Sequence, residues 1–449
     1  MKIVKTTWIV VLLMTVMAMA QDATEETETQ PQAATNAFQS GDWLQWQKMT
    51  GDWGGVRTDL ADIGITFDMD ITQIVQGNAH GGRTTKNAFR YSGTADLTLT
   101  LDTTKLGLWK GGTIVLNAEP RWANGINSKV GSLSPANLDA IKPFAGDDCE
   151  FTLSEWFLQQ VLFDGKLILI AGKLDGSRAF DTNAFANNER TQFMNASLRN
   201  NPMIPSFLPY TILGAAAVVN PTPWLSVLTA AADSEGSNAT TGFDTTFHGP
   251  THTTVIHEWS VKIKPFDLPG TQRVGFAWSS KEFAHLNPIS PFKETGPFLM
   301  KYAPKVLDLL SPYLPYDHSP DNVMLYYNFD QYLYTEADDP NQGVGMFGRF
   351  GWARDDVNPV NYFYSIGLGA KGIVPTRDND TCGVGYYHLD LSNDLPYMFH
   401  SEQGVECYYN IEIAPWLHIT PDLQVIMNPG GTDDNDVSVV YGMRMQMNL

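Results

Sequence analysis

The sequence predicts an all-β protein, a transmembrane antiparallel up-and-down β-barrel of about 16 strands with a short N-terminal helix and inward-folding loops. Apolar and polar residues alternate in many short segments, with 436–449 as the clearest case. Charged residues make up 17% of the chain, below the roughly 25% of soluble domains. Beyond the first 20 residues there is no run of 18 apolar residues, so no transmembrane helix is expected.

The segment 436–449 has one apolar and one polar face. Every odd position from Val437 to Leu449 is apolar, whereas the even positions, Val440 apart, are polar or glycine. Successive side chains of a strand point to opposite faces, and about 9–11 tilted residues cross a bilayer. The segment therefore fits a barrel strand, and by itself it also fits the edge strand of a soluble sandwich.

The N-terminal part of the chain divides into three predicted regions. Residues 1–20 have a positive start, an apolar centre and a small-x-small end, which predicts a cleaved export signal. Residues 21–42 are polar and acidic, and we expect a disordered leader. Residues 43–64 form an N-terminal helical segment, in which Arg57–Ile63 can be a short helix closed by Gly64.

The barrel is expected to occupy residues 65–449. Its strand-like segments alternate with turns and with longer loops, and their even number suits an antiparallel barrel. Two loops, 123–150 and 177–211, are long enough to fold inward and narrow a passage. The predicted strands are 65–78, 95–105, 112–122, 151–163, 166–176, 212–221, 224–235, 253–265, 273–282, 322–334, 345–356, 362–373, 381–391, 404–415, 417–428 and 436–449.

Charge and cysteine content exclude some classes of protein. The net charge of −20 argues against binding nucleic acid, which needs basic patches. Cys149 and Cys382 fall where they could pair, while Cys407 lies on an apolar strand face and is expected to be buried. His248, His252 and His257 lack the spacing of a zinc site, so neither metal nor cofactor is expected.

Taken together, an ordered series of motifs resembles the carbohydrate-selective outer-membrane porins, the OprB-type family. The resemblance runs from about residue 43 to the end of the chain. Its motifs are Thr50–Arg57 with Leu60–Ile65, Glu155–Gln160, Ala171–Asp175, Phe185–Phe193, Val374–Asp378, Glu402–Tyr409, Pro421–Gln424 and Asn428–Gly431.

The resemblance implies a 16-stranded channel through which glucose-like sugars and polyols diffuse across the outer membrane of a Gram-negative-type bacterium. Such a channel performs no enzymatic reaction and needs no energy coupling. Its implied partners are small sugars, outer-membrane lipid and, during biogenesis, the barrel-assembly machinery. A homotrimer is one assembly that the sequence leaves open, and the identity of the sugar is not encoded in any motif.

The polar face of each strand predicts the lumen. Sugar hydroxyls pair with charged and amide groups, and sugar C–H faces stack on aromatic rings such as Trp122, Phe157 or Tyr408. The alternative for each lumen residue is a purely structural ion pair or polar ladder. The predicted substrate-binding residues are Glu119, Arg121, Glu155, Gln159, Lys173, Asp175, Asn188, Glu189, Arg190, Arg349, Glu406 and Tyr408.

Three other functions are compatible with parts of the sequence. The net charge of −20 would suit a general, cation-leaning diffusion porin. Abundant carboxylates would suit a secreted carbohydrate-active protein, although such a protein would not need amphipathic strands to the end of the chain. A non-conducting receptor would need a plug domain, and the mature residues before the first strand are too few for a large one.

Overall fold

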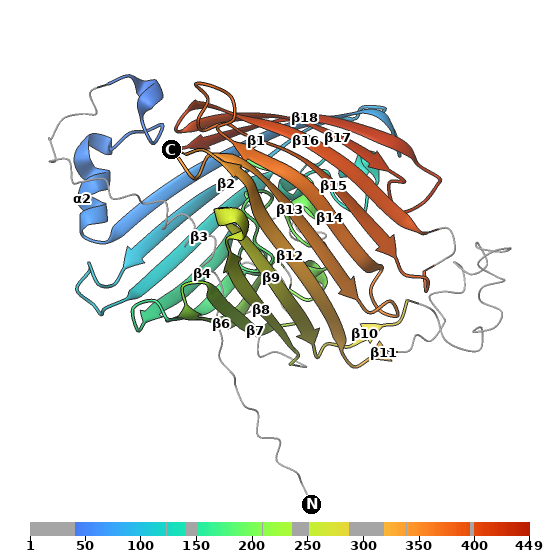
Figure 1. The fold of residues 1–449 in the computed structure, drawn as a ribbon, viewed down its shortest axis with the longest axis horizontal. Helices are drawn as coiled ribbons and strands as arrows, with labels where there is room; N and C mark the ends of the chain where they lie inside the picture. Colours follow the sequence, from blue (N-terminus) through green and yellow to red (C-terminus); the bar gives the residue numbers. More distant parts are fainter. Residues whose placement is uncertain are drawn as a thin grey trace, which may run out of the picture.

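Sixteen antiparallel strands close into one barrel within the part of the chain that the structure describes (Figure 1). This confirms the predicted fold class. Around the barrel the order is β1-β18-β17-β16-β15-β14-β13-β12-β9-β8-β7-β6-β5-β4-β3-β2. The structure, a computed structural model, describes residues 41–122, 124–140, 151–208, 210–235, 251–286, 318–337, 339–395 and 399–449.

All the predicted strands are present, and β2 begins earlier than expected. Phe89 and Tyr91 extend it along the outer face and pair with β1. The barrel strands are β1 (Ile65–Gly82), β2 (Phe89–Asp102), β3 (Gly112–Trp122), β4 (Phe151–Leu162), β5 (Leu167–Asp175), β6 (Thr211–Thr222), β7 (Leu225–Asp233), β8 (Thr253–Ile263), β9 (Gly270–Ser279), β12 (Asn322–Thr335), β13 (Gly343–Ala353), β14 (Val360–Lys371), β15 (Thr381–Leu391), β16 (Ser401–Ala414), β17 (Leu417–Met427) and β18 (Asp436–Asn448).

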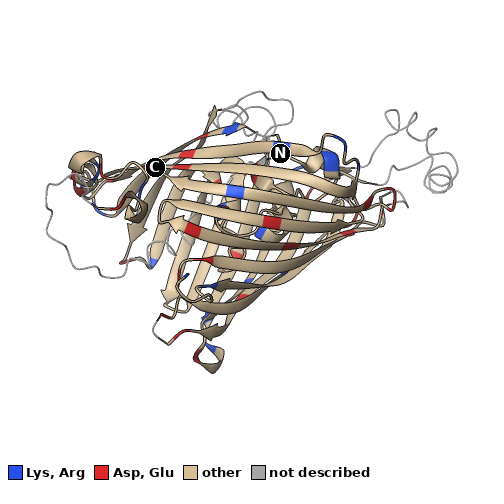
Figure 2. Cartoon of the chain, turned by 90° about the horizontal axis from the view of Figure 1, so that it is seen from above, with Lys and Arg blue, Asp and Glu red and all other residues tan. Residues whose placement is uncertain are grey.

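Alternation places polar side chains inside the barrel and apolar side chains outside. In β18, Arg444 and Gln446 are buried in the interior, while Tyr441 and Met443 are exposed on the outer face. Charged residues are sparse along the strands (Figure 2). Large aromatic and aliphatic side chains form the outer surface, as expected of a barrel surrounded by lipid.

The N-terminal segment is fastened to the end of the barrel at which β18 finishes. The Trp43 and Trp416 rings lie 4.3 Å apart, and the Trp416 indole N–H donates to the Trp43 carbonyl at 3.0 Å. Arg57 donates to the Leu449 carbonyl oxygen at 2.9 Å. This segment contains η1 (Trp43–Gln45), η2 (Trp53–Gly55) and α2 (Val56–Asp62).

The connections differ between the two ends of the barrel. The end near α2 has tight turns such as 163–166 and 223–224, whereas the opposite end has the long connections 123–150 and 176–210. None of the described helices is long and apolar enough to span a membrane. The short elements in the connections are α3 (Asn127–Val130), η3 (Leu138–Ala140), η4 (Gly176–Arg178), α4 (Ala196–Arg199), η5 (Ile204–Ser206), η6 (Pro265–Asp267), β10 (Phe283–Ala284) and β11 (His318–Ser319).

The expectation that Cys407 is buried was wrong, because its side chain is exposed. Cys382, for which the sequence left a disulfide open, has a free thiol. Cys407 pairs in register with Val384 and lies on the outer face of the barrel. An apolar side chain on the outer face contacts lipid, so it does not have to be buried against other residues of the protein. Cys149 lies outside the described residues.

Gly343 provides a test of strand register at the start of β13. It has a φ of +153°, and an added Cβ would lie 2.1 Å from the Tyr334 carbonyl oxygen. Gly343→Ala is therefore expected to destabilise the barrel by about 1–3 kcal/mol through this clash, in addition to its backbone strain. The measurement is the temperature at which the folded, fast-migrating form in detergent gels is lost.

Gly165→Ala is the matched control. Gly165 also has a positive φ, of +81°, but nothing lies within 4 Å of its added Cβ. This variant should show only the conformational cost of about 1–2 kcal/mol. Equal transition temperatures for the two variants would contradict the proposed clash.

Candidate functional site

Residues 176–208, here called the inner loop, lie inside the barrel. Their backbone is bound by inward side chains from strands far apart around the circumference, among them Glu258 of β8, Arg349 of β13 and Arg444 of β18. Because these strands face one another across the lumen, the loop must cross it. The predicted inward folding of this loop is therefore seen in the structure.

Aromatic side chains of the inner loop pack against a glycine-rich part of the wall. Phe185 and Phe193 are almost fully buried. An added Cβ would lie 2.1 Å from the Phe185 ring at Gly345, and 2.8 Å from Phe185 at Gly369. Since these inward glycines have no side chain, β13 and β14 can take the aromatic rings directly against their backbone.

Arg349 binds the inner loop through several hydrogen bonds. Its guanidinium donates to the Asp181 carboxylate and to the carbonyls of Leu198 and Ala186, each at 2.8 Å, and both charged side chains are fully buried. Asp181 also accepts the Asn201 amide N–H at 2.8 Å. A planar guanidinium that donates to several acceptors orients the loop as well as binding it.

Buried carboxylates hold the loop backbone in the same way. Glu406 accepts the amide N–H groups of Met194 and Asn195 at 2.6 and 2.9 Å. Glu258 accepts the Asp181 amide N–H at 3.0 Å. Glu406 and Arg349, predicted from the sequence to bind substrate, therefore contact loop backbone, and neither lines the cavity described below.

A second inward segment, residues 124–140, packs beside the inner loop. Its Ala136 carbonyl accepts from Gln76 and Gln424 at 3.2 and 2.8 Å. Its Pro135 carbonyl accepts the Ala196 amide N–H of the inner loop at 3.0 Å. The two segments thus support each other, while the rest of the predicted loop, 141–150, lies outside the described residues.

Charged groups of the inner loop gather around Glu189. Its carboxylate pairs with Arg199, and Arg178 lies 3.4 Å away. Burial alone would raise the pKa of Glu189, but the guanidiniums of Arg199 and Arg178 hold that pKa well below its usual range. Glu189 therefore stays ionised at neutral and mildly acidic pH, and the cluster keeps its charges.

Arg190 and Arg178 connect the loop to the acidic wall of β1, β2 and β4. Arg190 lies 2.9 Å from Asp70 and 3.3 Å from Asp96. Arg178 lies 3.6 Å from Asp96 and 3.5 Å from Glu155. The two arginine side chains remain 31% and 29% exposed, so they keep surface for solutes in the lumen.

Other predicted residues form a buried polar wall on β3–β5. Arg121 pairs with Glu119, which also accepts from the Tyr210 hydroxyl at 2.8 Å. Lys173 is fully buried and donates to the Leu153 carbonyl at 2.8 Å.

The remaining residues of this wall are placed close by. The Glu155 carboxylate accepts the Asp175 amide N–H at 3.1 Å, and Gln159 is half-buried.

Trp122, expected as a stacking surface, pairs with Gly93 and packs on it from the outer face. Trp122 and Leu116 are an even number of residues apart on β3, so their side chains lie on the same face. Leu116 is exposed on the outer face, and Trp122 therefore does not face the lumen.

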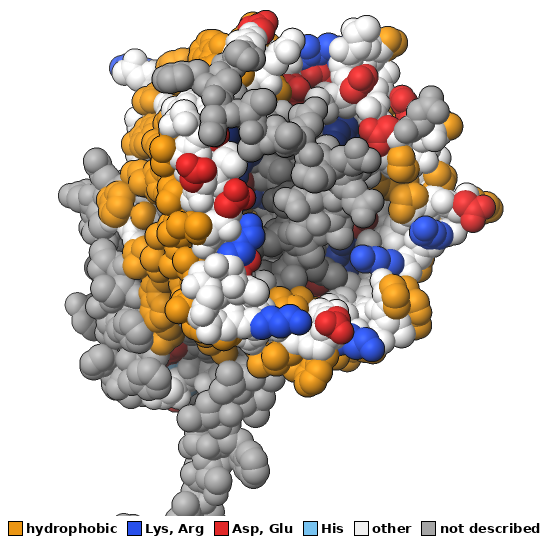
Figure 3. Space-filling model, turned by 90° about the vertical axis from the view of Figure 1, so that its left-hand side faces the viewer, with side chains coloured by type: hydrophobic (Ala, Val, Ile, Leu, Met, Phe, Trp, Pro, Cys, Tyr) orange, Lys and Arg blue, Asp and Glu red, His pale blue; other side chains and the backbone are white. Residues whose placement is uncertain are grey.

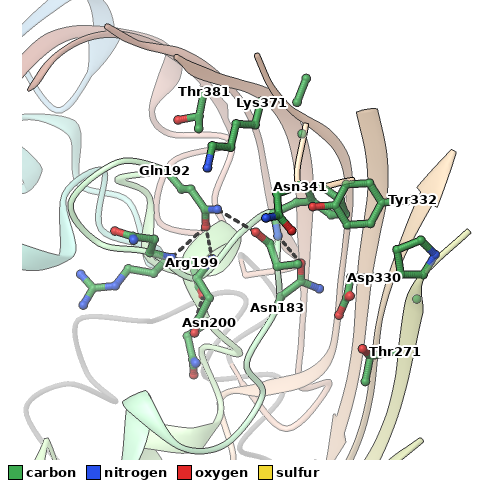
Figure 4. A pocket seen from close by; sticks show the side chains of 18 of the residues that line it. Asn183, Gln192, Arg199, Asn200, Thr271, Asp330, Tyr332, Asn341, Lys371 and Thr381 are labelled. Atoms are coloured by element: carbon green, nitrogen blue, oxygen red, sulfur yellow. Dashed lines mark hydrogen bonds between the residues drawn. The ribbon is translucent and has the colours of Figure 1, made fainter. Parts of the chain in front are cut away.

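A cavity of about 910 Å³ lies between the inner loop and the turns at the α2 end of the barrel (Figure 4). At that end, charged side chains surround the opening and apolar ones lie on the outer flank (Figure 3). The cavity is lined by Asn183, Asn187, Asn188, Gln192, Asn200, Thr271, Asn341 and Thr381, by Arg178, Glu189, Arg190, Arg199, Lys262, Lys264, Asp330 and Lys371, and by Phe185, Trp224, Tyr332 and Tyr408, among others.

Four of the predicted substrate-binding residues line this cavity: Asn188, Glu189, Arg190 and Tyr408. Arg178 and Arg199 were missed, because loop residues have no periodicity that would assign them to the lumen. Trp224, the first residue of the predicted strand 224–235, was not assigned to the lumen. All three residues lie in connections between strands, where there is no two-residue repeat to predict whether a side chain points into the lumen.

Residues 86–449 match the family model of the carbohydrate-selective porins, the OprB family. The chain belongs to this family. Porin B of Pseudomonas aeruginosa is 23% identical over 89% of this chain and 90% of its own length. An uncharacterised protein of Aquifex aeolicus is 32% identical over 74% of this chain and 82% of its own length.

The fold agrees with this assignment. A structure of Pseudomonas putida OprB at high pH superimposes with a TM-score of 0.78, at 23% identity, over 90% of this chain and 99% of that one. The chain is thus a sugar porin, and the family and the barrel point to the bacterial outer membrane. Family and fold are those of a channel rather than an enzyme.

Arg349→Met tests whether the wall holds the loop of this porin. The variant leaves the buried Asp181 carboxylate without its cation, which costs about 3–5 kcal/mol for a buried pair. The inner loop should open, so single-channel conductance should rise and trisaccharides should enter liposomes that contain the variant.

Arg354→Met is the matched control. Arg354 lies at the end of the barrel away from α2, where it pairs with Asp321 and Asp356 and not with the inner loop. Its conductance should equal that of the wild type. A folded Arg349→Met barrel with unchanged conductance and size limit would show that Arg349 does not hold the loop.

Proposed function

We propose that this porin lets small neutral sugars diffuse through the lumen past the inner loop, with the cavity of about 910 Å³ as the compartment where they exchange water for protein groups. The liquid share of a water molecule is about 30 Å³, so the cavity corresponds to about 30 waters. A monosaccharide can therefore enter with part of its hydration shell. No covalent step, cofactor or energy source takes part.

The composition of the cavity lining carries this proposal. Amides, hydroxyls, guanidiniums and two carboxylates converge there with aromatic rings. Sugars present hydroxyls, which are both donors and acceptors, together with apolar C–H faces. A compartment with both kinds of group replaces hydration without binding so tightly that release is slow.

The inner loop is the proposed selectivity element. Arg178, Glu189 and Arg190 reach the cavity from this loop, and each is held by wall or loop partners that fix its direction. Fixed donors and acceptors discriminate between solutes better than mobile ones, because less side-chain freedom is lost on contact.

The setting of the channel is part of the same proposal. We assign residues 1–20 to an export signal, place the barrel in the outer membrane of a Gram-negative-type bacterium, and expect lipid around its apolar outer face. The barrel-assembly machinery would insert it. Whether it works as one barrel or as a homotrimer does not change the route through the lumen.

Liposome swelling by the purified porin tests the proposal. Monosaccharides should enter faster than neutral amino acids of matched size, because only sugars use both the polar groups and the rings. Equal rates would reduce the protein to a general diffusion porin. Absence of swelling by a protein shown to be folded would contradict passage altogether.

Arg190→Gln tests the role of the inner loop. The change removes a charged donor that lines the cavity and leaves a shorter, neutral amide in its place. Hydrogen bonds to charged groups contribute about 1.5–3 kcal/mol, so the affinity measured from glucose-induced block of the ion current should fall by about tenfold or more. Lys166→Gln, in a tight turn outside the cavity, should leave that affinity unchanged, and an equal affinity in both variants would exclude Arg190 from sugar contact.

A further inference from the structure

The charges that line the cavity have the opposite sign to the net charge of the chain. The chain carries −20, yet the cavity is lined by six cationic side chains and two carboxylates. The cations are Arg178, Arg190, Arg199, Lys262, Lys264 and Lys371, and the carboxylates are Glu189 and Asp330. The acidity of the chain as a whole therefore does not describe the compartment that a solute enters.

The arginines and lysines of this lining differ in their partners. Arg178, Arg190 and Arg199 all form ion pairs with wall or loop carboxylates, and Asp330 is paired with Arg273. For the three lysines, no ion pair is present among the residues that the structure describes. The uncompensated charge of the cavity is therefore that of the lysines.

Lys262 and Lys371 take the last inward positions of β8 and β14. Glu258 and Ser260 are buried on the inner face of β8, and Lys262 comes two residues after Ser260, so it belongs to the same face. Figure 4 shows Lys371 reaching into the cavity beside Gln192. Strands β9, β12 and β13 lie between the two lysines, so the lysines flank the cavity at the α2 end.

An aromatic ring and neutral hydrogen-bonding groups line the cavity together with these lysines. The Lys262 amide N–H donates to the Trp224 carbonyl at 2.8 Å, and the Trp224 side chain, 53% exposed, lines the same cavity. Asn341 and Thr271 add an amide and a hydroxyl to the lining. An aromatic face, neutral hydrogen-bonding groups and an unpaired ammonium together suit a sugar that carries a negative charge.

We propose that Lys262 and Lys371, each on its own flank of the cavity, provide binding positions for the carboxylate of acidic sugars, such as aldonates or uronates, and make the channel prefer these anions to cations. The proposal rests on the passage of sugars proposed above and extends it to carboxylated sugars. Positive potential in a narrow compartment raises the local concentration of anions and their rate of entry. On this proposal, the negative net charge of the chain comes from residues outside the cavity that the solute enters.

The reversal potential in a planar bilayer under a potassium chloride gradient tests the lysines directly. Wild-type porin should prefer chloride to potassium. Lys262→Gln/Lys371→Gln should move the reversal potential towards the equilibrium potential of potassium. Lys262→Arg/Lys371→Arg should keep the wild-type reversal potential, because it keeps the charge.

Lys110→Gln/Lys166→Gln is the matched control. It removes the same charge from turns at the same end of the barrel, and neither lysine lines the cavity. Its reversal potential should equal that of the wild type. A shift as large as that of the cavity variant, or a wild-type channel without preference for chloride, would overturn the proposal.

Liposome swelling in sodium gluconate and in glucose then separates this proposal from the passage of neutral sugars. In Lys262→Gln/Lys371→Gln the ratio of the gluconate rate to the glucose rate should fall by about threefold. Equal falls for both solutes would show a structural defect and overturn the proposed carboxylate positions. If the wild type passes no glucose, the proposed function fails, and the reversal potential still decides about the lysines.

Discussion

The buried pairing of Arg349 with Asp181 is the interaction on which the interior of this porin depends. It joins the wall of the barrel to a loop that would otherwise be free in a wide, water-filled lumen. Isolated burial of either charge would be strongly unfavourable, so the pair persists only because the carbonyls of Leu198 and Ala186 and the amide of Asn201 complete its hydrogen bonds. The loop conformation and the pair therefore require each other.

The same principle recurs around the lumen. Glu406 and Glu258 accept loop amide N–H groups, and Arg444 donates to the carbonyls of Glu189 and Gln192 at 2.9 and 2.7 Å. Irregular backbone cannot be buried without partners, and these wall side chains supply them. The charges left with exposed surface, on Arg178 and Arg190, are then held in place in the lining of the cavity.

The sequence predicted the fold better than the site. Each barrel strand overlaps a predicted one, and for many of them the signal was two-residue alternation, because lipid outside and water inside impose opposite chemistry on the two faces of a strand. Alternation also placed Arg349 and Glu406 correctly in the interior. It could not show that they bind loop backbone, because an amide N–H has no signature in the sequence, and Arg178 and Arg199 lie in a segment without any repeat.

Hydrogen exchange of the Met194 and Asn195 amides tests most directly whether the wall holds the inner loop. Both amides donate to the buried Glu406 carboxylate. In folded porin in detergent, a peptide covering them should exchange as slowly as the barrel strands, and should exchange faster in Glu406→Gln. Exchange in the wild type as fast as that of an exposed loop would contradict an inner loop held by the barrel wall.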